Sequence, residues 1–280
     1  MSAALALGFS PCPNDTFAFY ALVHGRLSGA PVVRAVLEDI ETLNRLALRR
    51  ELDVAKVSFH AYAGLRPHYF LLRSGGALGR GCGPLVVARE PLAPADLARL
   101  QVAIPGERTT AALLLRLFCP AVTAPRVMPF HRIMPAVAAG EVDAGVIIHE
   151  SRFTYPQHGL VQVADLGAWW ETTTGHPIPL GGIAARRSLG AGLVLRLERA
   201  LRASVAYARA HPEETRPYVA RHAQEMDEAV RRAHIELYVN DFTLDYGSAG
   251  EAAISHLLAR AGDQGLAVGA EAPLFACEPA

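Results

Sequence analysis

The sequence predicts an α/β protein built as two lobes, each with a largely parallel sheet and helices on its faces. Three observations predict it. Short apolar runs alternate with longer segments of helical period, residues 41–59 have an echo at residues 131–148, and two clusters of glycine and proline flank the middle of the chain. Such alternation is typical of parallel sheets covered by helices. The 280 residues suffice for about two domains.

Each expected strand is a run of apolar residues, and each expected helix has apolar residues at every third or fourth position. The expected strands are Leu5–Phe9, Val32–Leu37, Asp53–Val57, Val102–Ile104, Arg126–Met128 and Ala144–Ile148. The helices expected between them are Asp15–Val23, Glu41–Arg49, Thr109–Phe118 and Arg132–Ala139. Beyond about Gly190 the pattern is mostly helical, with helices expected at Leu193–Arg209, Glu213–Arg221, Asp227–Tyr238 and Glu251–Ala261.

The echo predicts two similar lobes. Glu41–Phe59 and His131–Ile148 each contain an amphipathic helix, then Glu-x-Asp, then a small or apolar strand. A chance similarity of two helix–strand units is the alternative.

Two segments rich in glycine and proline are expected to carry the chain between the lobes: Ser74–Arg89 and Thr172–Arg186. Lobe one then comprises residues 1–87 and 181–280, and lobe two comprises residues 88–180. An interrupted lobe requires two crossover hinges and leaves a cleft between the lobes. Proteins of this plan close around a ligand by hinge motion, so a small polar molecule is the expected partner.

Charge and cysteine content exclude several classes of protein. Basic and acidic residues each total 27 and no basic run occurs, which argues against a nucleic-acid partner. No apolar stretch reaches the ~18 residues of a membrane span, and the N-terminus lacks a signal peptide, so a cytoplasmic location is expected. The four cysteines are far apart, which predicts reduced thiols and no zinc ribbon.

The first candidate site follows the first strand, because ligands of open parallel sheets bind beyond the carboxyl ends of strands. The segment Ser10–Phe17 has prolines at positions 11 and 13, and Asn14 or Asp15 can cap the helix that follows. A helix N-terminus suits an anion. An ordinary capped helix is the alternative.

The second candidate site is the tripeptide Lys56, Val57 and Ser58, which closes the expected third strand. Lys56 is the only lysine among the 27 basic residues. Side chains alternate along a strand, so Lys56 and Ser58 share a face. A cation beside a hydroxyl suits a carboxylate or a polarised carbonyl. The alternative is a salt bridge at the edge of the sheet.

The third candidate site is the pair Thr109 and Thr110, which opens a helix after a glycine turn. The two hydroxyls and the N-terminal amides form a neutral cradle for an anion. The spacing of a Walker phosphate loop is absent. A plain helix cap is the alternative.

The fourth candidate is His149, which follows the apolar strand Ala144–Ile148. A histidine at a strand tip can accept a proton at neutral pH, although a structural role is the alternative. No metal site is expected, because the histidines form no H-E-x-x-H pattern. Nor is a nicotinamide cofactor, because no G-x-G-x-x-G follows the first strand.

Several motifs together resemble the 1,4-dihydroxy-6-naphthoate synthase family. They are SPCPNDTFAFYAL, DVAKVSFHAY, the Thr109–Thr110 helix start, GVIIHESRFTY and YVNDFTLDYG. The resemblance runs from Ser10 to Gly247, and SPCPNDTF and IIHE are its most specific parts. Nothing matches from Gly190 to Ala233.

The resemblance implies a two-lobed periplasmic-binding-protein-like (type II) fold and a cytoplasmic role in menaquinone synthesis by the futalosine route. It implies a carbon–carbon lyase that converts cyclic dehypoxanthinylfutalosine, a spiro-ring carboxylate, to 1,4-dihydroxy-6-naphthoate and a dihydroxyacetone fragment without metal or organic cofactor. The family's proton-accepting histidine falls on His149. Its substrate contacts fall on Lys56 to Ser58 and on Thr109 with Thr110.

Three alternatives remain. Chorismate dehydratase has a related fold in the same pathway, but SPCPNDTF is not typical of its start. A solute-binding protein of a transporter, or the effector lobe of a transcription factor, would bind a small molecule without catalysis. Within the synthase reading, Lys56 could form a Schiff base with a substrate ketone.

Overall fold

The computed structural model describes residues 4–224, 227–265 and 272–277. Contacts within the chain define two units: the first is Met1–Gly79 with Pro179–Ala280, and the second is Arg80–Ile178. The sequence placed the boundaries at 87/88 and 180/181. The first boundary lies earlier in the structure because residues 85–88 pair with strands of the second unit.

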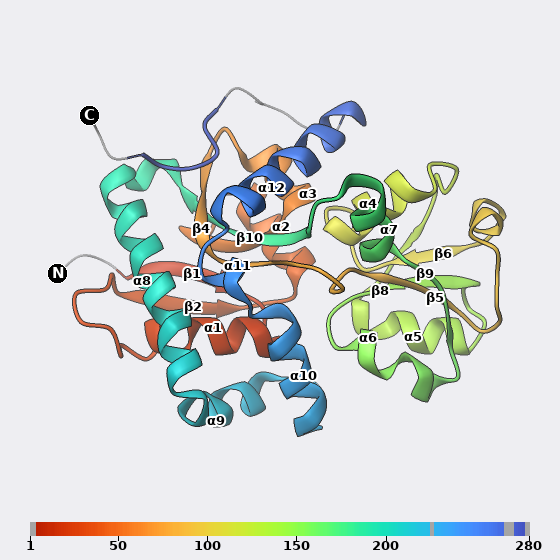
Figure 1. Ribbon diagram of the computed structural model, residues 1–280, viewed down its shortest axis with the longest axis horizontal. Coiled ribbons are helices and arrows are strands. Elements are labelled where there is room, and N and C mark those ends of the chain that lie inside the picture. The colour runs from red at the N-terminus through yellow and green to blue at the C-terminus, as the bar shows by residue number, and fades with distance from the viewer. Residues whose placement is uncertain (1–3, 225–226, 266–271, 278–280) are drawn as a thin grey trace. The chain divides into compact units, whose positions relative to one another are not determined.

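The first unit contains a five-stranded sheet in the order β2-β1-β3-β10-β4 (Figure 1). Its strands are β1 (Leu5–Phe9), β2 (Val33–Leu37), β3 (Val54–Ser58), β4 (Tyr69–Gly79) and β10 (Ile178–Arg186). β1 runs parallel to β2 and β3, whereas β10 runs antiparallel to β3. β1 and β3 therefore end at the same edge of the sheet, where Ser10 and Ser58 lie.

Helices of the first unit cover its sheet and extend its core. They are α1 (Pro13–Val23), α2 (Ile40–Leu48), α3 (Phe59–Leu65), α8 (Ala191–Ala210), α9 (Pro212–His222), α10 (Glu228–Tyr238), α11 (Asp241–Leu244) and α12 (Gly247–Asp263), with the 3₁₀ helix η3 (Arg187–Leu189). Leu7 and Phe9 of β1 pack with Phe19 of α1 and with Leu197 and Leu201 of α8. This packing fixes the first turn of α1 beside the end of β3, and α10 also contacts α1.

The second unit repeats the plan, with the strand order β7-β6-β8-β5-β9. Its strands are β5 (Leu85–Ala88), β6 (Val102–Ile104), β7 (Arg126–Val127), β8 (Ala144–Ile147) and β9 (Val161–Asp165). Its helices are α4 (Thr110–Phe118), α5 (Phe130–Ala138), α6 (Ser151–Thr154) and α7 (Leu166–Thr174), with the 3₁₀ helices η1 (Pro94–Arg99) and η2 (Tyr155–His158). β6 is parallel to β7 and β8, and β5 is antiparallel to β8.

The two sheets correspond strand by strand at their centres. β1 and β6 hold the second place, β3 and β8 the third, and an antiparallel strand follows each. The helix–strand pairs α2–β3 and α5–β8, which include most of the two echoing segments, therefore occupy the same place in the two units.

The glycine-rich segments expected as connections are largely strands. β4 includes Ser74–Gly79, and β10 includes the glycines at 181 and 182. Gly75 has a φ of +83°, and a Cβ there would lie 2.9 Å from Cγ1 of Ile183. These glycines thus serve close packing within the sheet. Among the helices of the described residues, none is long and apolar enough to cross a membrane.

Candidate active site

The first turn of α1 carries a carboxylate. The helix begins at Pro13, with Cys12 in the N-cap position, and Asn14 and Asp15 follow within the first turn. The prediction that Asn14 or Asp15 caps the helix is therefore wrong, because proline at the first helical position starts it earlier. Asp15 instead places its negative charge where the helix dipole favours it.

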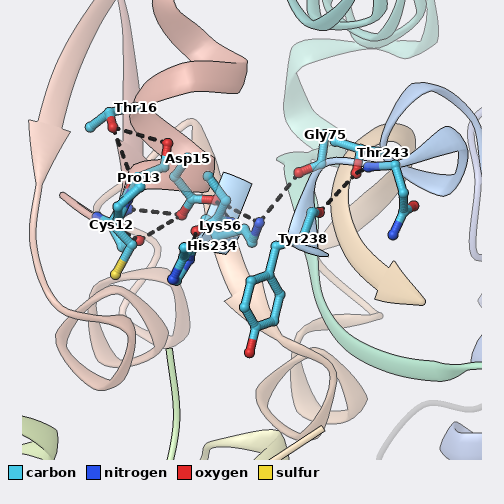
Figure 2. A network of polar contacts seen from close by, with 12 residues as sticks. Cys12, Pro13, Asp15, Thr16, Lys56, Gly75, His234, Tyr238 and Thr243 are labelled. Atoms are coloured by element: carbon cyan, nitrogen blue, oxygen red, sulfur yellow. Dashed lines mark hydrogen bonds and ion pairs between the residues drawn. The ribbon is translucent and has the colours of Figure 1, made fainter. Parts of the chain in front are cut away.

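Asp15 accepts four hydrogen bonds (Figure 2). Its Oδ2 accepts from Ser10, at 2.8 Å from the hydroxyl and 3.2 Å from the backbone nitrogen. Its Oδ1 accepts from Asn14 Nδ2 at 2.9 Å and from Lys56 Nζ at 2.8 Å. All four partners donate, so Asp15 acts as an ionised carboxylate.

Lys56 forms a buried ion pair with Asp15. Lys56 is 5% exposed, and its Nζ also donates to the carbonyl of Gly75 at 3.3 Å. The salt bridge that the sequence offered as the alternative for Lys56 is present, and its partner Asp15 lies on α1. An ammonium has three hydrogens, and within the described residues only these two partners engage Lys56. One hydrogen remains to donate to an oxygen of a ligand.

Ser58 shares the Lys56 face of β3 and is held by a residue that the sequence reasoning did not identify. The backbone nitrogen of Ser58 donates to Asn44 Oδ1 at 2.9 Å, and Asn44 Nδ2 donates to the Ser58 hydroxyl at 3.1 Å. Since that hydroxyl accepts from Asn44, its own hydrogen can donate elsewhere. Val57 is fully buried on the opposite face, so any contact that it makes with a ligand falls to its backbone.

Thr109 is the N-cap of α4, which is the alternative that the sequence offered for this residue. Its Oγ1 accepts from the backbone nitrogen of Ala112 at 3.2 Å and donates to the carbonyl of Gly106 at 2.8 Å. Thr109 and Thr110 are 2% and 3% exposed. The hydroxyl of Thr109 is thus committed to the helix start.

His149 lies just beyond β8, and its backbone is in an unusual conformation. Its φ is 59°, one of two positive values among the described residues other than glycine. Its imidazole meets the ring of Phe130 edge-on, with the ring centroids 5.2 Å apart and the planes at 69°. The side chain is half-buried. Because β6 and β8 are parallel neighbours, Thr109 and His149 follow strands that end at the same edge of this sheet.

An ion pair anchors the turn after His149. Arg152 Nη2 lies 2.6 Å from Asp165 Oδ2, and Arg152 Nη1 donates to the carbonyl of Gly83 at 2.7 Å. Asp165 also caps α7. The short helix α6 is thereby tied to the residues just before β5 and at the end of β9, which meet at one end of this antiparallel pair.

Two further side chains of the second unit, Cys82 and Trp170, are buried in its core. Burial, with a smaller effect of the Glu171 carboxylate, raises the pKa of the Cys82 thiol to about 12, which keeps it protonated at neutral pH. Trp170 is 1% exposed and donates to the carbonyl of Pro177, so it belongs to the core. Among the described residues, no group of three or more His, Cys, Asp and Glu side chains is placed to hold a metal ion.

The structure adds His234 to the group around Asp15. This histidine of α10 is fully buried, and its Nε2 lies 2.9 Å from Asn14 Oδ1. The two residues are 220 positions apart. No local pattern distinguishes His234 from other histidines in helical segments, so the sequence alone does not indicate its place in this group.

Comparison with known proteins relates the chain to one family. A model of the menaquinone biosynthesis family matches residues 5–263. A protein of Thermus thermophilus named 1,4-dihydroxy-6-naphthoate synthase is 58% identical over 272 residues, which are 97% of this chain and 99% of that protein. A protein of the same name from Streptomyces coelicolor is 55% identical over 279 residues, which are 97% of this chain and 98% of that protein.

Solved structures agree on the fold. A protein from Archaeoglobus fulgidus matches with a TM-score of 0.87 and 38% identity over 94% of this chain and 98% of that one. The periplasmic aliphatic sulphonate-binding protein of Escherichia coli matches with a TM-score of 0.66 and 12% identity, over 100% of this chain and 94% of that one. At such low identity the likeness shows the fold alone. It confirms the predicted two-lobed, periplasmic-binding-protein-like α/β fold.

Proposed function

The chain belongs to the menaquinone biosynthesis family, and we propose that it is a 1,4-dihydroxy-6-naphthoate synthase. The observation that carries this proposal is its 58% identity with the Thermus thermophilus synthase over 97% of its length. The proposed reaction is a carbon–carbon cleavage of cyclic dehypoxanthinylfutalosine, a carboxylate, to 1,4-dihydroxy-6-naphthoate and dihydroxyacetone. It takes place in the cytoplasm and uses neither a metal nor an organic cofactor.

His149 is the proposed general base. Its left-handed φ of 59° is an outlier for a residue with a side chain, and backbone strain of this kind concentrates at functional sites. The edge of Phe130 restricts the imidazole. A neutral imidazole held in this way can accept a proton from the substrate.

Lys56 and Ser58 are the proposed donors to substrate oxygens. Each has a hydrogen that no described residue accepts, and both side chains lie on one face of β3. Thr110 and the backbone N–H groups at the start of α4 are the proposed donors of the second unit. Asn14 and Asp15 are proposed to act on the substrate through Lys56, because their side chains are bonded to one another and to it.

Removal of a substrate hydroxyl proton by His149 leaves an oxygen electron pair that forms a carbonyl as the spiro carbon–carbon bond breaks. The electron pair of the broken bond passes to a substrate carbonyl as an enolate, and the proton on His149 returns to the products. Fixed donors then stabilise the developing negative charge, and formation of the aromatic ring supplies driving force. A covalent intermediate on Lys56 requires a free amine. Lys56 is held by hydrogen bonds to a carboxylate and a carbonyl, so we assign it a binding role.

The proposal is tested by incubating the purified protein with cyclic dehypoxanthinylfutalosine, without added cofactor, and analysing the products by liquid chromatography and mass spectrometry. We expect 1,4-dihydroxy-6-naphthoate. Folded protein that gives none contradicts the assignment, and a parallel incubation with chorismate tests the dehydratase. Borohydride added during turnover leaves Lys56 unmodified if its role is binding, whereas a mass adduct on Lys56 overturns that role.

A further inference from the structure

His234 reaches the Lys56 site from a part of the chain to which the family's motifs assigned no function. It lies on α10, is fully buried, and approaches Asn14 in the first turn of α1. Its ring also packs against Tyr238 on the same helix, with the centroids 4.6 Å apart. Figure 2 shows His234 beside the group formed by Asp15 and Lys56.

Hydrogen-bond chemistry fixes the direction of this contact. Ionised Asp15 can only accept, so Asn14 must present its Nδ2 to Asp15 Oδ1, where the distance is 2.9 Å. The oxygen of Asn14 then faces His234. Because that oxygen can only accept, Nε2 of His234 carries a hydrogen and donates it across 2.9 Å.

A directed series of bonds follows, from His234 to Asn14, from Asn14 to Asp15, and from Lys56 to the same Asp15 oxygen. The lysine side chain is long and flexible, so its ammonium is located by what it binds. Ser10 fixes the other oxygen of Asp15. His234 thus holds the side-chain amide of Asn14, which donates to the same Asp15 oxygen as the Lys56 ammonium.

We propose that His234 is a positioning residue for Lys56, acting through Asn14 and Asp15. The proposal rests on the proposed function in so far as Lys56 binds the substrate. An apolar side chain at position 234 would leave the buried oxygen of Asn14 without its donor, which is unfavourable. Asn14 can then rotate toward another donor, and Asp15 and Lys56 shift with it.

The single lysine of this sequence allows a test without substrate. Protein labelled with ¹⁵N- and ¹³C-lysine gives one set of side-chain NMR signals, which report Lys56 alone. We expect His234→Met to shift the Cε and Nζ signals and His234→Gln to leave them close to wild type, because glutamine retains a donor. Signals unchanged in His234→Met overturn the proposal.

Steady-state kinetics tests the consequence for the substrate. We expect His234→Met to raise KM about tenfold with kcat within about threefold, the signature of lost uniform binding, and His234→Gln to recover most of that loss. Ser204→Ala is the matched control: it removes buried hydrogen bonds to Ala18 and Leu22 of α1 without touching Asn14 or Asp15. An equal rise of KM in Ser204→Ala reduces His234 to a general structural role and overturns the proposal.

The outcomes distinguish a failure of the proposed function from a failure of the positioning role. If wild type makes no product, the proposed function fails, and the lysine signals still decide whether His234 positions Lys56. If wild type is active and His234→Met leaves both KM and the lysine signals unchanged, the positioning role fails while the synthase assignment stands. A His234→Met variant that does not fold is replaced by Asn14→Leu, which breaks the same series at its next member.

Discussion

Lys56 lies near the end of β3 and His149 follows β8, and these two strands hold corresponding places in the two sheets. The protein fixes the two side chains by different means. Lys56 is 5% exposed and bound to a carboxylate that accepts four hydrogen bonds. His149 is half-buried, with a left-handed backbone and an aromatic ring against its imidazole. A buried ion pair with the fully hydrogen-bonded Asp15 carboxylate fixes Lys56, and backbone conformation with ring packing fixes His149. Substitutions should therefore reduce stability at Lys56 and turnover at His149.

The largest effect is expected for His149→Asn, which should lower kcat about 10³-fold because a general base contributes ~10²–10⁴-fold. Asparagine tolerates the left-handed conformation, so the melting temperature should stay near that of wild type, and substrate affinity within about tenfold. His131→Asn is the control, since His131 is exposed on α5 and also contacts Phe130. Turnover within tenfold of wild type in His149→Asn removes His149 from the role of base.

Lys56→Met should lower the free energy of unfolding by about 3–5 kcal/mol, because it leaves the buried Asp15 carboxylate without its cation. The double variant with Asp15→Asn should recover part of this loss, since no uncompensated charge remains. Urea denaturation at pH 7 measures both. Arg49→Met breaks an exposed ion pair with Glu51 and should change little. Equal stability of the Lys56→Met and Arg49→Met variants would remove the contrast between the two sites.

Gly75→Ala should cost about 2–4 kcal/mol of unfolding free energy, from backbone strain and crowding together. The carbonyl of Gly75 accepts from Lys56, its φ is +83°, and an added Cβ would meet Leu201 and Ile183. Gly25→Ala separates the two causes. Gly25 also has a positive φ, of +63°, but nothing lies within 4 Å of its Cβ position, so only strain of about 1 kcal/mol is expected there. Equal losses of unfolding free energy in the two variants mean that crowding of the added Cβ contributes nothing at Gly75.

Phe130→Leu should lower kcat about 2–10-fold with KM nearly unchanged, because an edge-on aromatic pair contributes ~0.5–1.5 kcal/mol. The expected cause is a less restricted His149 imidazole. Phe118→Leu is the matched control: Phe118 meets Trp169 edge-on at 5.5 Å in the same unit. A similar fall of kcat in both variants assigns the effect to general loosening of the second unit.

The local features of both sites could be predicted from sequence. Apolar runs ending at polar residues located the strand ends that carry Lys56 and His149, and hydroxyl chemistry identified Thr109 as a cap. The partners of Lys56 could not be predicted in the same way. Asp15 lies 41 residues from Lys56, and His234 lies 220 residues from Asn14. Periodicity describes which face of an element is buried, and it contains no information about which distant element covers that face.

The backbone conformations of Gly75 and His149 could not be predicted from the sequence either. Glycine clusters usually mark turns, but Gly75 lies in β4, because the space beside Ile183 and Leu201 admits no side chain. The left-handed conformation of His149 has no signal in the residues around it. At Gly75, tertiary packing overrides the local preference.

Tyr246→Phe gives the smallest expected effect and tests whether full hydrogen bonding of buried polar groups, as at Asp15, extends to the rest of the first unit. Tyr246 is 1% exposed, and its hydroxyl has no hydrogen-bond partner within the described residues. Removing an unsatisfied buried hydroxyl should leave the free energy of unfolding unchanged or raise it by up to about 1 kcal/mol. Tyr62→Phe should lower it, because the Tyr62 hydroxyl donates to the carbonyls of Tyr69 and Leu274.

The pH dependence adds an independent readout. Burial raises the pKa of Tyr246 above its ordinary value of 10.0, so at high pH the unfolded chain loses this proton more readily than the folded chain. The stability contributed by the protonated phenol is therefore complete below about pH 10 and declines as the pH rises further. Urea denaturation from pH 8 to pH 11 should show a smaller decline for Tyr246→Phe than for wild type. If Tyr246→Phe is instead less stable than wild type at pH 8, the hydroxyl has a partner, and the full hydrogen bonding seen at Asp15 extends to this part of the core of the first unit.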